Sequence, residues 1–348
     1  SQTMFGLLKS CSGLLCPLST LDGETAVGGN MQKIIHLLSS LYVERDEIVR
    51  MLVAAILARQ HAFIVGPPGT AKSAMIRDLA RGLGGLAYFG WQLNEFTTPE
   101  EIFGPVDIAS LADSTVPPQF RFRRITTGKL PEAELVFLDE VFKASPAILN
   151  TLLTIVQERV FQNGGAEEPV PLMTLTAASN EVPAANQRLE ALWDRFLVRL
   201  QVRYIQSPSN FIQMLLGETG NVPLLLSRED TLAAQEATAK VQIPLSIAES
   251  VQKVWLALGE RGVVMSDRRY KAALDILRAV AFLEGRQQVE EPDLLALQHI
   301  LWHDPGQARE VAQVVFAVAE PLLLSVTEIE DSAIEAVNSA REALRKEG

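Results

Sequence analysis

The chain has 348 residues, of which 48% are hydrophobic and 21% charged, and its 42 acidic residues against 31 Lys and Arg give a net charge of −11. A chain of this kind can bury the cores of about two domains, which excludes intrinsic disorder, and its acidic excess disfavours nucleic-acid binding by the whole surface. Two cysteines are too few for a disulfide scaffold or a metal cage, so we expect a reducing, cytoplasmic compartment.

The sequence predicts neither a secretory signal nor a membrane span. The N-terminus lacks the basic head, long apolar middle and small-residue cleavage site of a signal peptide. The most apolar later run, residues 311–326, contains Gln313, Glu320 and Pro321 and falls short of the roughly 20 apolar residues of a spanning helix. We expect a buried or partner-facing helix there.

Before about residue 205, short apolar or β-branched runs alternate with helical patterns. This alternation is typical of a parallel sheet covered by helices on both faces, so the first part is predicted to be α/β. The predicted strands are residues 61–65, 86–91, 135–138, 173–178 and 197–202.

After residue 207 the periodicity is helical almost throughout. Helices are predicted at residues 210–217, 229–240, 246–261, 267–284 and 292–299. We therefore expect an N-terminal extension over residues 1–30, an α/β core over 31–206, an all-helical unit over 207–304 and a helical C-terminal extension over 305–348. The extension reaches the last residue without a stop signal, which suggests a truncated chain.

A glycine-rich turn connects the first predicted strand to a helix that begins near Lys72. Small residues let backbone N–H groups curl around phosphate oxygens in front of a helix N-terminus. Lys72 would reach the β and γ phosphates and the Ser73 hydroxyl would bind Mg²⁺, although Ala71 stands where the usual pattern has Gly. An ordinary strand-to-helix turn is the alternative. The residues expected at the nucleotide are Gly66, Pro67, Pro68, Gly69, Thr70, Ala71, Lys72, Ser73 and Ala74.

Two adjacent carboxylates follow the apolar run at residues 135–138. Asp139 and Glu140 would be costly at the end of a buried strand unless a cation lies nearby. With the phosphate-binding turn at the same sheet edge, Asp139 would hold Mg²⁺, mainly through water, and Glu140 would polarise the attacking water. The alternative is an acidic pair that begins a helix.

With these two motifs placed, the chain resembles the AAA+ ATPases and, within them, the MoxR family, most closely its RavA-type branch. Ala before the Lys is common in that family's loop. The resemblance implies a P-loop core with a five-stranded parallel sheet, followed by an all-α lid. It rests on GPPGTAKS at 66–73, TTPEEIFGP at 97–105, LPEAELVFLDEVFKASPAILNTLLT at 130–154, AASNEVP at 177–183, LEALWDRFLVRL at 189–200 and SDRRYKAAL at 266–274.

The resemblance also implies roles for single residues. Asn180 is similar to the sensor asparagine that orients the attacking water, and Arg195 to the arginine finger that enters the neighbouring subunit's site. Arg268 is similar to the lid arginine that contacts the phosphates of its own subunit, with Arg269 as a solvated neighbour. Arg199 is expected to form an ion pair rather than to assist the finger.

By the same resemblance, adenine is expected beside the main chain of Tyr42 and Val43, with lid residues 270–277 covering the base from the other side. Residues 119–124 alternate aromatic and basic side chains, which fits a plain hairpin strand, a pore or substrate contact, or, least, a nucleic-acid contact. A second hairpin is predicted over residues 158–171, with Glu158 in a surface ion pair rather than a contact between subunits.

Taken together, these features predict a Mg²⁺-dependent ATPase that assembles as a hexameric ring with ATP at each interface. In the MoxR family such motors act as chaperones that mature or activate protein complexes, often with a partner that carries a von Willebrand factor A domain. Two alternatives stay open. The first is a nucleotide-controlled adaptor with incidental turnover, and the second is a nucleic-acid motor, for which only residues 119–124 could supply a basic channel.

Overall fold

The computed structural model describes residues 23–112, 115, 117, 121–182, 187–217 and 220–321. Both cysteines, most of the expected N-terminal extension and the end of the expected C-terminal extension lie outside the described residues. Within the described part, no helix combines the length and the apolar character that a membrane span requires.

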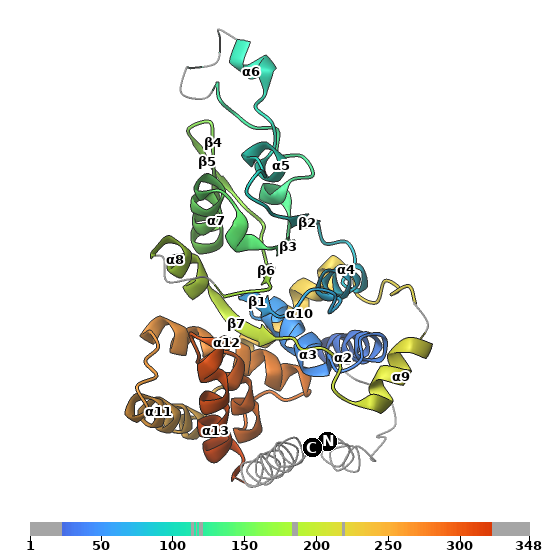
Figure 1. Cartoon of the computed structure of the whole chain (residues 1–348), viewed down its shortest axis with the longest axis vertical. Coiled ribbons are helices and arrows are strands. Elements are labelled where there is room, and N and C mark those ends of the chain that lie inside the picture. The colour runs from blue at the N-terminus through green and yellow to red at the C-terminus, as the bar shows by residue number, and fades with distance from the viewer. Residues whose placement is uncertain are drawn as a thin grey trace, which may run out of the picture.

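A five-stranded parallel sheet forms the centre of the α/β part, with the strand order β2-β3-β6-β1-β7 (Figure 1). The α/β prediction is confirmed, and each strand lies within two residues of its expected start. The bounds are β1 His61–Val65, β2 Tyr88–Gln92, β3 Leu135–Asp139, β6 Thr174–Ser179 and β7 Phe196–Gln201.

The three central strands are buried on both faces, and β3 accordingly has a continuous apolar run in its sequence. Helix α3 (Asp46–Leu57) buries nine of its residues beside them. Apart from two five-residue helices described below, the remaining helices of this part are α2 Gly23–Leu41, α4 Lys72–Gly82, α7 Pro146–Glu158 and α8 Gln187–Arg195, with short 3₁₀ turns η2 Leu130–Glu132 and η3 Val141–Lys143.

The second half of the described chain is helical, as predicted. One element differs in type, because residues 291–299 form the 3₁₀ helix η4 rather than an α-helix. The elements are α9 Pro208–Leu216, α10 Arg228–Lys240, α11 Leu245–Glu260, α12 Asp267–Leu283, η4 Glu291–His299, η5 Pro305–Gln307 and α13 Ala308–Ala319.

Helices α10 and α12 pack against α2 and α3. The buried Gln235 of α10 donates its amide to the Ile56 carbonyl (2.8 Å), and Arg50 of α3 pairs with Glu284 after α12 (2.7 Å). Helices from the two ends of the described chain therefore share one packed layer beside the sheet, and the expected domain boundary at residue 206 stays a prediction.

Short segments project from the end of the molecule that lies away from the C-terminal helices in Figure 1. They are α5 Pro99–Phe103, α6 Ile108–Ala112, β4 Val160–Asn163 and β5 Ala166–Pro169. Strands β4 and β5 form the predicted second hairpin. The expected strand at 119–124 is not formed over its described part, because Arg121 and Phe122 lie in a turn and Arg124 pairs only in an isolated bridge. Residues 119 and 120 lie outside the described residues.

Candidate functional site

Three loops meet at the carboxyl edge of the sheet. Strands β1, β3 and β6 are neighbours, and their last residues lie in register, with Val65 opposite Ser179 and Asp139 opposite Ala178. The predicted phosphate-binding turn, the carboxylate pair and Asn180 therefore lie side by side. This is where ligands gather in parallel α/β sheets.

The turn between β1 and α4 has the backbone that its small residues predict. A Cβ at Gly66 would collide with the Val202 carbonyl, so only Gly fits at this position. Gly69 (φ 76°) and Ala71 (φ 62°) both adopt the left-handed region. That region admits the Cβ of Ala71 at a steric cost, which explains how the turn forms without a Gly before Lys72.

The buried side chain of Lys72 folds back over this turn. Its Nζ donates to the carbonyls of Gly66 (2.6 Å) and Pro67 (3.1 Å) and to Oδ1 of Asn180 (3.3 Å). Burial lowers the pKa of Lys72, while Asp139 and Glu140 oppose that shift. The ammonium group is thus held at the point where the turn would place a phosphate.

Ser73 and Asp139 offer adjacent oxygen atoms at the start of α4. Oγ of Ser73 lies 3.3 Å from Oδ2 of Asp139, and Oδ1 of Asp139 accepts from the Glu140 amide (3.1 Å). Oxygen donors suit Mg²⁺, which keeps several waters and uses few protein ligands. Among the described residues no group of three or more His, Cys, Asp or Glu could hold a metal.

Glu140 is buried and its carboxylate is held by neighbouring polar groups. Its Oε1 accepts from Nδ2 of Asn180 (2.7 Å), and its Oε2 accepts from Oγ of Ser179 (3.2 Å) and lies 3.4 Å from Nζ of Lys143. Asn180 uses both ends of its amide, because Nδ2 donates to Glu140 while Oδ1 accepts from Lys72. One side chain therefore connects the general-base candidate to the phosphate-binding lysine.

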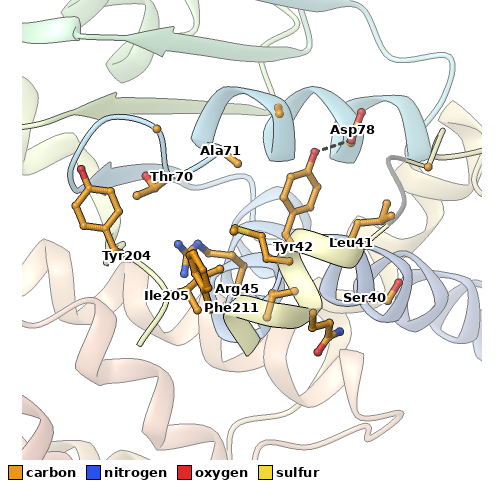
Figure 2. Close-up of a pocket in the computed structure, with 17 residues that line it drawn as sticks. Ser40, Leu41, Tyr42, Arg45, Thr70, Ala71, Asp78, Tyr204, Ile205 and Phe211 are labelled. Carbon is orange, nitrogen blue, oxygen red and sulfur yellow. Dashed lines mark hydrogen bonds between the residues drawn. The ribbon is translucent and has the colours of Figure 1, made fainter. Parts of the chain in front are cut away.

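A cavity of about 820 Å³ opens beside the turn (Figure 2). Tyr42 and Val43, beside which adenine was expected, are among the residues that line it. The Tyr42 hydroxyl donates to Oδ2 of Asp78 (2.6 Å), and burial together with this bond raises the pKa of Tyr42. Gly69, Thr70, Ala71 and Ala74 of the turn and of α4 also line this cavity.

The opposite wall of this cavity is formed by residues that the sequence reasoning missed. Figure 2 shows Tyr204, Ile205 and Phe211 facing the cavity, from the segment after β7 and from α9. Lid residues 270–277 were expected there, but none of them lines this cavity, and Tyr270 lines a separate cavity with Trp255. Tyr204 and Ile205, which follow β7 closely in the sequence, were the available signal.

Arg195 lies at the amino edge of the sheet, opposite the phosphate-binding turn. It is the last residue of α8, and the next residue, Phe196, is paired with His61 at the start of β1. Its Nη2 donates to Oε1 of Gln157 (2.8 Å). The length of strand β1 separates Arg195 from the turn of its own chain.

Arg268 lies on the same edge as Arg195. It is exposed, and its charge acts on both Arg195 and His61. Burial lowers the pKa of Arg195 most, and Arg268 lowers it further. Arg268 was expected to contact the phosphates of its own subunit. The structure contradicts this expectation, because β1 separates Arg268 from Lys72.

The expectation that Arg269 is solvated is wrong. Its guanidinium is 3% exposed and reaches four backbone carbonyls, with Nε on Ile300 (2.6 Å), Nη1 on Asp194 (3.2 Å) and Nη2 on Phe196 and Leu197 (2.9 and 2.7 Å). This side chain ties α12 to the start of β7.

Arg199 is also buried, and the predicted ion pair is not formed in the described part of the chain. Its guanidinium stacks over Trp193 (4.2 Å to the ring centroid) and donates to the carbonyls of Trp193 and Trp302. Burial, assisted by the charge of Arg269, lowers the pKa of Arg199 to about 8. Arg199 is thus a buried cation that packs between two indoles rather than a surface charge.

The sequence matches two family models. Residues 29–236 match the MoxR domain of the MoxR–vWA–β-propeller ternary systems, and residues 246–315 match an AAA lid domain. The chain belongs to the MoxR family of AAA+ ATPases. This confirms the predicted family, and the five-stranded core and helical C-terminal region agree with it.

Similar proteins span much of the chain. Uncharacterized protein MJ0812 of Methanocaldococcus jannaschii is 39% identical, over 83% of this chain and 76% of that protein. Chaperone MoxR1 of Mycobacterium tuberculosis is 26% identical, over 80% of this chain and 76% of that protein. A crystal structure of a candidate ATPase from Cytophaga hutchinsonii has the same fold, with a TM-score of 0.67 at 16% identity, over 85% of this chain and 96% of that one.

Proposed function

We propose that this MoxR-family chain is a Mg²⁺-dependent ATPase that forms a hexameric ring and remodels or activates a protein partner. The observation that carries the proposal is the side chain of Asn180, which joins Glu140 (2.7 Å) to Lys72 (3.3 Å) beside the phosphate-binding turn. A carboxylate, an amide and an ammonium group in this order can position a water molecule for in-line attack on a γ-phosphate.

In this proposal Lys72 exchanges its carbonyl partners for phosphate oxygens when ATP binds. Glu140 accepts the proton of a water molecule, whose oxygen attacks the γ-phosphorus while the bond to the bridging oxygen of ADP breaks. Asn180 orients that water. When bound at Ser73 and Asp139, Mg²⁺ would neutralise charge on the β and γ phosphates.

The positions of Arg195 and Arg268 support a ring. Both lie at the amino edge of the sheet, whereas the phosphate-binding turn lies at the carboxyl edge. A head-to-tail assembly brings one edge against the other and closes when the rotation between subunits fits. We propose that both arginines reach the neighbour's ATP, where an arginine finger increases the rate by about 10³ to 10⁵.

Mixing two inactive variants tests this proposal. Lys72→Ala should not bind ATP, and Arg195→Ala should bind ATP but hydrolyse it slowly. Their mixture should recover part of the wild-type phosphate release, because Lys72→Ala subunits supply an intact Arg195 to the neighbouring site. Mixed rings without any recovery would contradict a finger that acts between subunits.

The proposed partner is a protein with a von Willebrand factor A domain. Support comes from the matched family model, whose MoxR domains occur in systems with vWA proteins. The Glu140→Gln variant should hold ATP without hydrolysing it and retain its partner. Pull-down with ATP, compared with ADP, should identify that partner, and a Glu140→Gln variant that still activates it would favour a nucleotide-controlled adaptor.

A nucleic-acid motor is not favoured. Two of the basic residues at 119–124 pair with carboxylates, Arg123 with Glu168 and Arg124 with Glu100 (3.0 Å). ATPase activity that single-stranded or duplex DNA stimulates at low salt would reverse this preference. The RavA-type branch and the cytoplasmic location stay predictions.

A further inference from the structure

The guanidinium of Arg195 is oriented by a neutral side chain. Its Nη2 donates to Oε1 of Gln157 (2.8 Å), an exposed residue near the end of α7. The carboxylate of Asp194 lies further away, because its Oδ2 is 3.6 Å from Nη1 of Arg195. The other oxygen of Asp194 lies 3.6 Å from Nη1 of the buried Arg269, so this carboxylate is shared between two arginines. The hydrogen bond that orients Arg195 is therefore made to an uncharged amide.

The main chain around Arg195 is anchored, so the direction of the side chain is what a partner can determine. Arg269 donates to the carbonyls of Asp194 (3.2 Å) and Phe196 (2.9 Å), the residues on either side of Arg195. The Arg195 side chain itself is 17% exposed. An unrestrained arginine loses much rotamer freedom when it binds in one orientation, and a partner that orients it beforehand reduces that cost.

The end of α7 gives Gln157 a defined position. The carbonyl of Val156, the preceding residue, lies 3.3 Å from Nε2 of His61 at the start of β1. Nη2 of Arg159 donates to the carbonyl of Arg59 (3.0 Å), just before the same strand. Both contacts attach this end of α7 to the amino edge of the sheet. The amide of Gln157 is therefore held beside the guanidinium by the fold.

An amide suits this position better than a carboxylate. A carboxylate at the same distance would form an ion pair with the guanidinium and would compete with a phosphate for it. An amide oxygen accepts one hydrogen bond and leaves the positive charge in place. Gln157 engages only Nη2, whereas a guanidinium has five N–H donors, so donors remain for a phosphate.

We propose that Gln157 is a positioning residue for Arg195, which aims the guanidinium at the neighbouring subunit's ATP without neutralising its charge. This inference rests on the proposed function, in which Arg195 acts between subunits. Gln157 contacts neither the nucleotide nor the attacking water and acts through Arg195. Gln157→Ala should lower kcat about tenfold, the effect of losing one hydrogen bond to a charged group, and should leave the Kd for ATP within about twofold.

Steady-state phosphate release and fluorescent-nucleotide titration measure these two quantities. Gln157→Glu keeps an acceptor oxygen but adds a charge, so it should lower kcat at least as much as Gln157→Ala. Gln242 is the matched control, because it is also an exposed glutamine with one side-chain hydrogen bond, from Nε2 to the Lys240 carbonyl (3.0 Å). Gln242→Ala and Gln242→Glu should both keep the wild-type kcat.

Two further measurements separate positioning from a general structural effect. In an Arg195→Ala background, Gln157→Ala should not lower kcat further, because its effect passes through Arg195. Gln157→Ala subunits mixed with Lys72→Ala subunits should recover part of the wild-type rate, because the Lys72→Ala subunits supply a correctly oriented arginine. A mixture of Gln157→Ala with Arg195→Ala subunits should recover none.

A wild-type kcat for Gln157→Ala or for Gln157→Glu would overturn the inference. An equal loss of kcat in the Arg195→Ala background would also overturn it, as would an equal loss in Gln242→Glu. Circular dichroism would verify that each variant is folded. If Arg195→Ala itself kept the wild-type kcat, the proposed finger and the inference would both fail. If Arg195→Ala were slow and Gln157→Ala were not, only the role of Gln157 would fail.

Discussion

Asn180 and Glu140 are joined by a hydrogen bond of 2.7 Å between Nδ2 and Oε1, at the carboxyl edge of two adjacent strands. The bond fixes the carboxylate at the position where a general base for water would lie. Glu140 itself has a left-handed backbone (φ 54°), so its side chain leaves the strand in a direction that the regular sheet does not provide.

Replacing Asn180 with Ala should therefore slow ATP hydrolysis without abolishing ATP binding. We expect kcat to fall by about 10² to 10³, the usual contribution of a group that positions a general base, and the Kd for ATP to change only a few-fold. Steady-state phosphate release and fluorescent-nucleotide titration measure the two quantities. Asn30→Ala, at an asparagine whose Oδ1 bonds the exposed Lys33, is the control, and a wild-type kcat for Asn180→Ala would remove Asn180 from the mechanism.

Replacing Ala71 with Gly should stabilise the chain. The left-handed backbone at Ala71 costs roughly 1–2 kcal/mol for a residue with a Cβ, and the greater freedom of Gly in the unfolded chain offsets part of the gain. We expect an increase of about 0.5–1 kcal/mol in the free energy of unfolding, measured by urea denaturation. Ala74→Gly, in the first turn of α4, is the matched control and should lower the free energy of unfolding by about 0.5–1 kcal/mol. If both variants changed this free energy in the same direction and by the same amount, the strain at Ala71 would be contradicted.

Replacing Arg269 with Gln should destabilise the chain strongly. The change leaves buried carbonyls without their donor, which we expect to cost about 2–4 kcal/mol in the free energy of unfolding. The neighbouring variant Arg268→Gln should stay within about 0.5 kcal/mol of the wild type, because Arg268 is exposed. Similar losses in the two variants would mean that the assignment of the buried arginine is wrong.

The buried imidazole of His61 predicts a loss of stability in mild acid. Burial lowers the pKa of His61 to about 3, while in the unfolded chain it stays near 6.5, so between these values the unfolded chain binds more protons. The free energy of unfolding should fall by up to about 1.4 kcal/mol for each pH unit below 6.5.

Urea denaturation at pH 7, 6 and 5 checks this prediction. In His61→Gln the slope of the unfolding free energy against pH should be smaller between pH 5 and pH 7. Ordinary carboxylates titrate below this range. His61 accepts from the Leu175 amide (3.0 Å), and Gln keeps a carbonyl acceptor for that bond. An unchanged slope would show that another group titrates.

Much of the core could be predicted because its signals are local. A strand buried on both faces has a continuous apolar sequence, as at residues 135–138, and a phosphate-binding turn needs small residues in a fixed order. The carboxylate pair at Asp139 and Glu140 is adjacent in sequence and in space. These features depend little on distant parts of the chain.

The arginines show where sequence reasoning fails. Arg268 and Arg269 are neighbours of the same chemistry, and only the packing of α12 against β7 decides that Arg269 is buried. The second wall of the cavity beside the phosphate-binding turn was missed for the same reason, because Phe211 and Tyr42 line it from distant parts of the chain.

The packing of α2 and α3 against α10 and α12 also determines which parts of the chain move together. The turn that carries Tyr42 and Val43 connects α2 to α3, so it is anchored in the same layer as the C-terminal helices. Any rotation of that layer against the sheet would carry one wall of the cavity beside the phosphate-binding turn with it, while the turn itself stays with β1. The width of that cavity therefore depends on how this helical layer is oriented against the sheet.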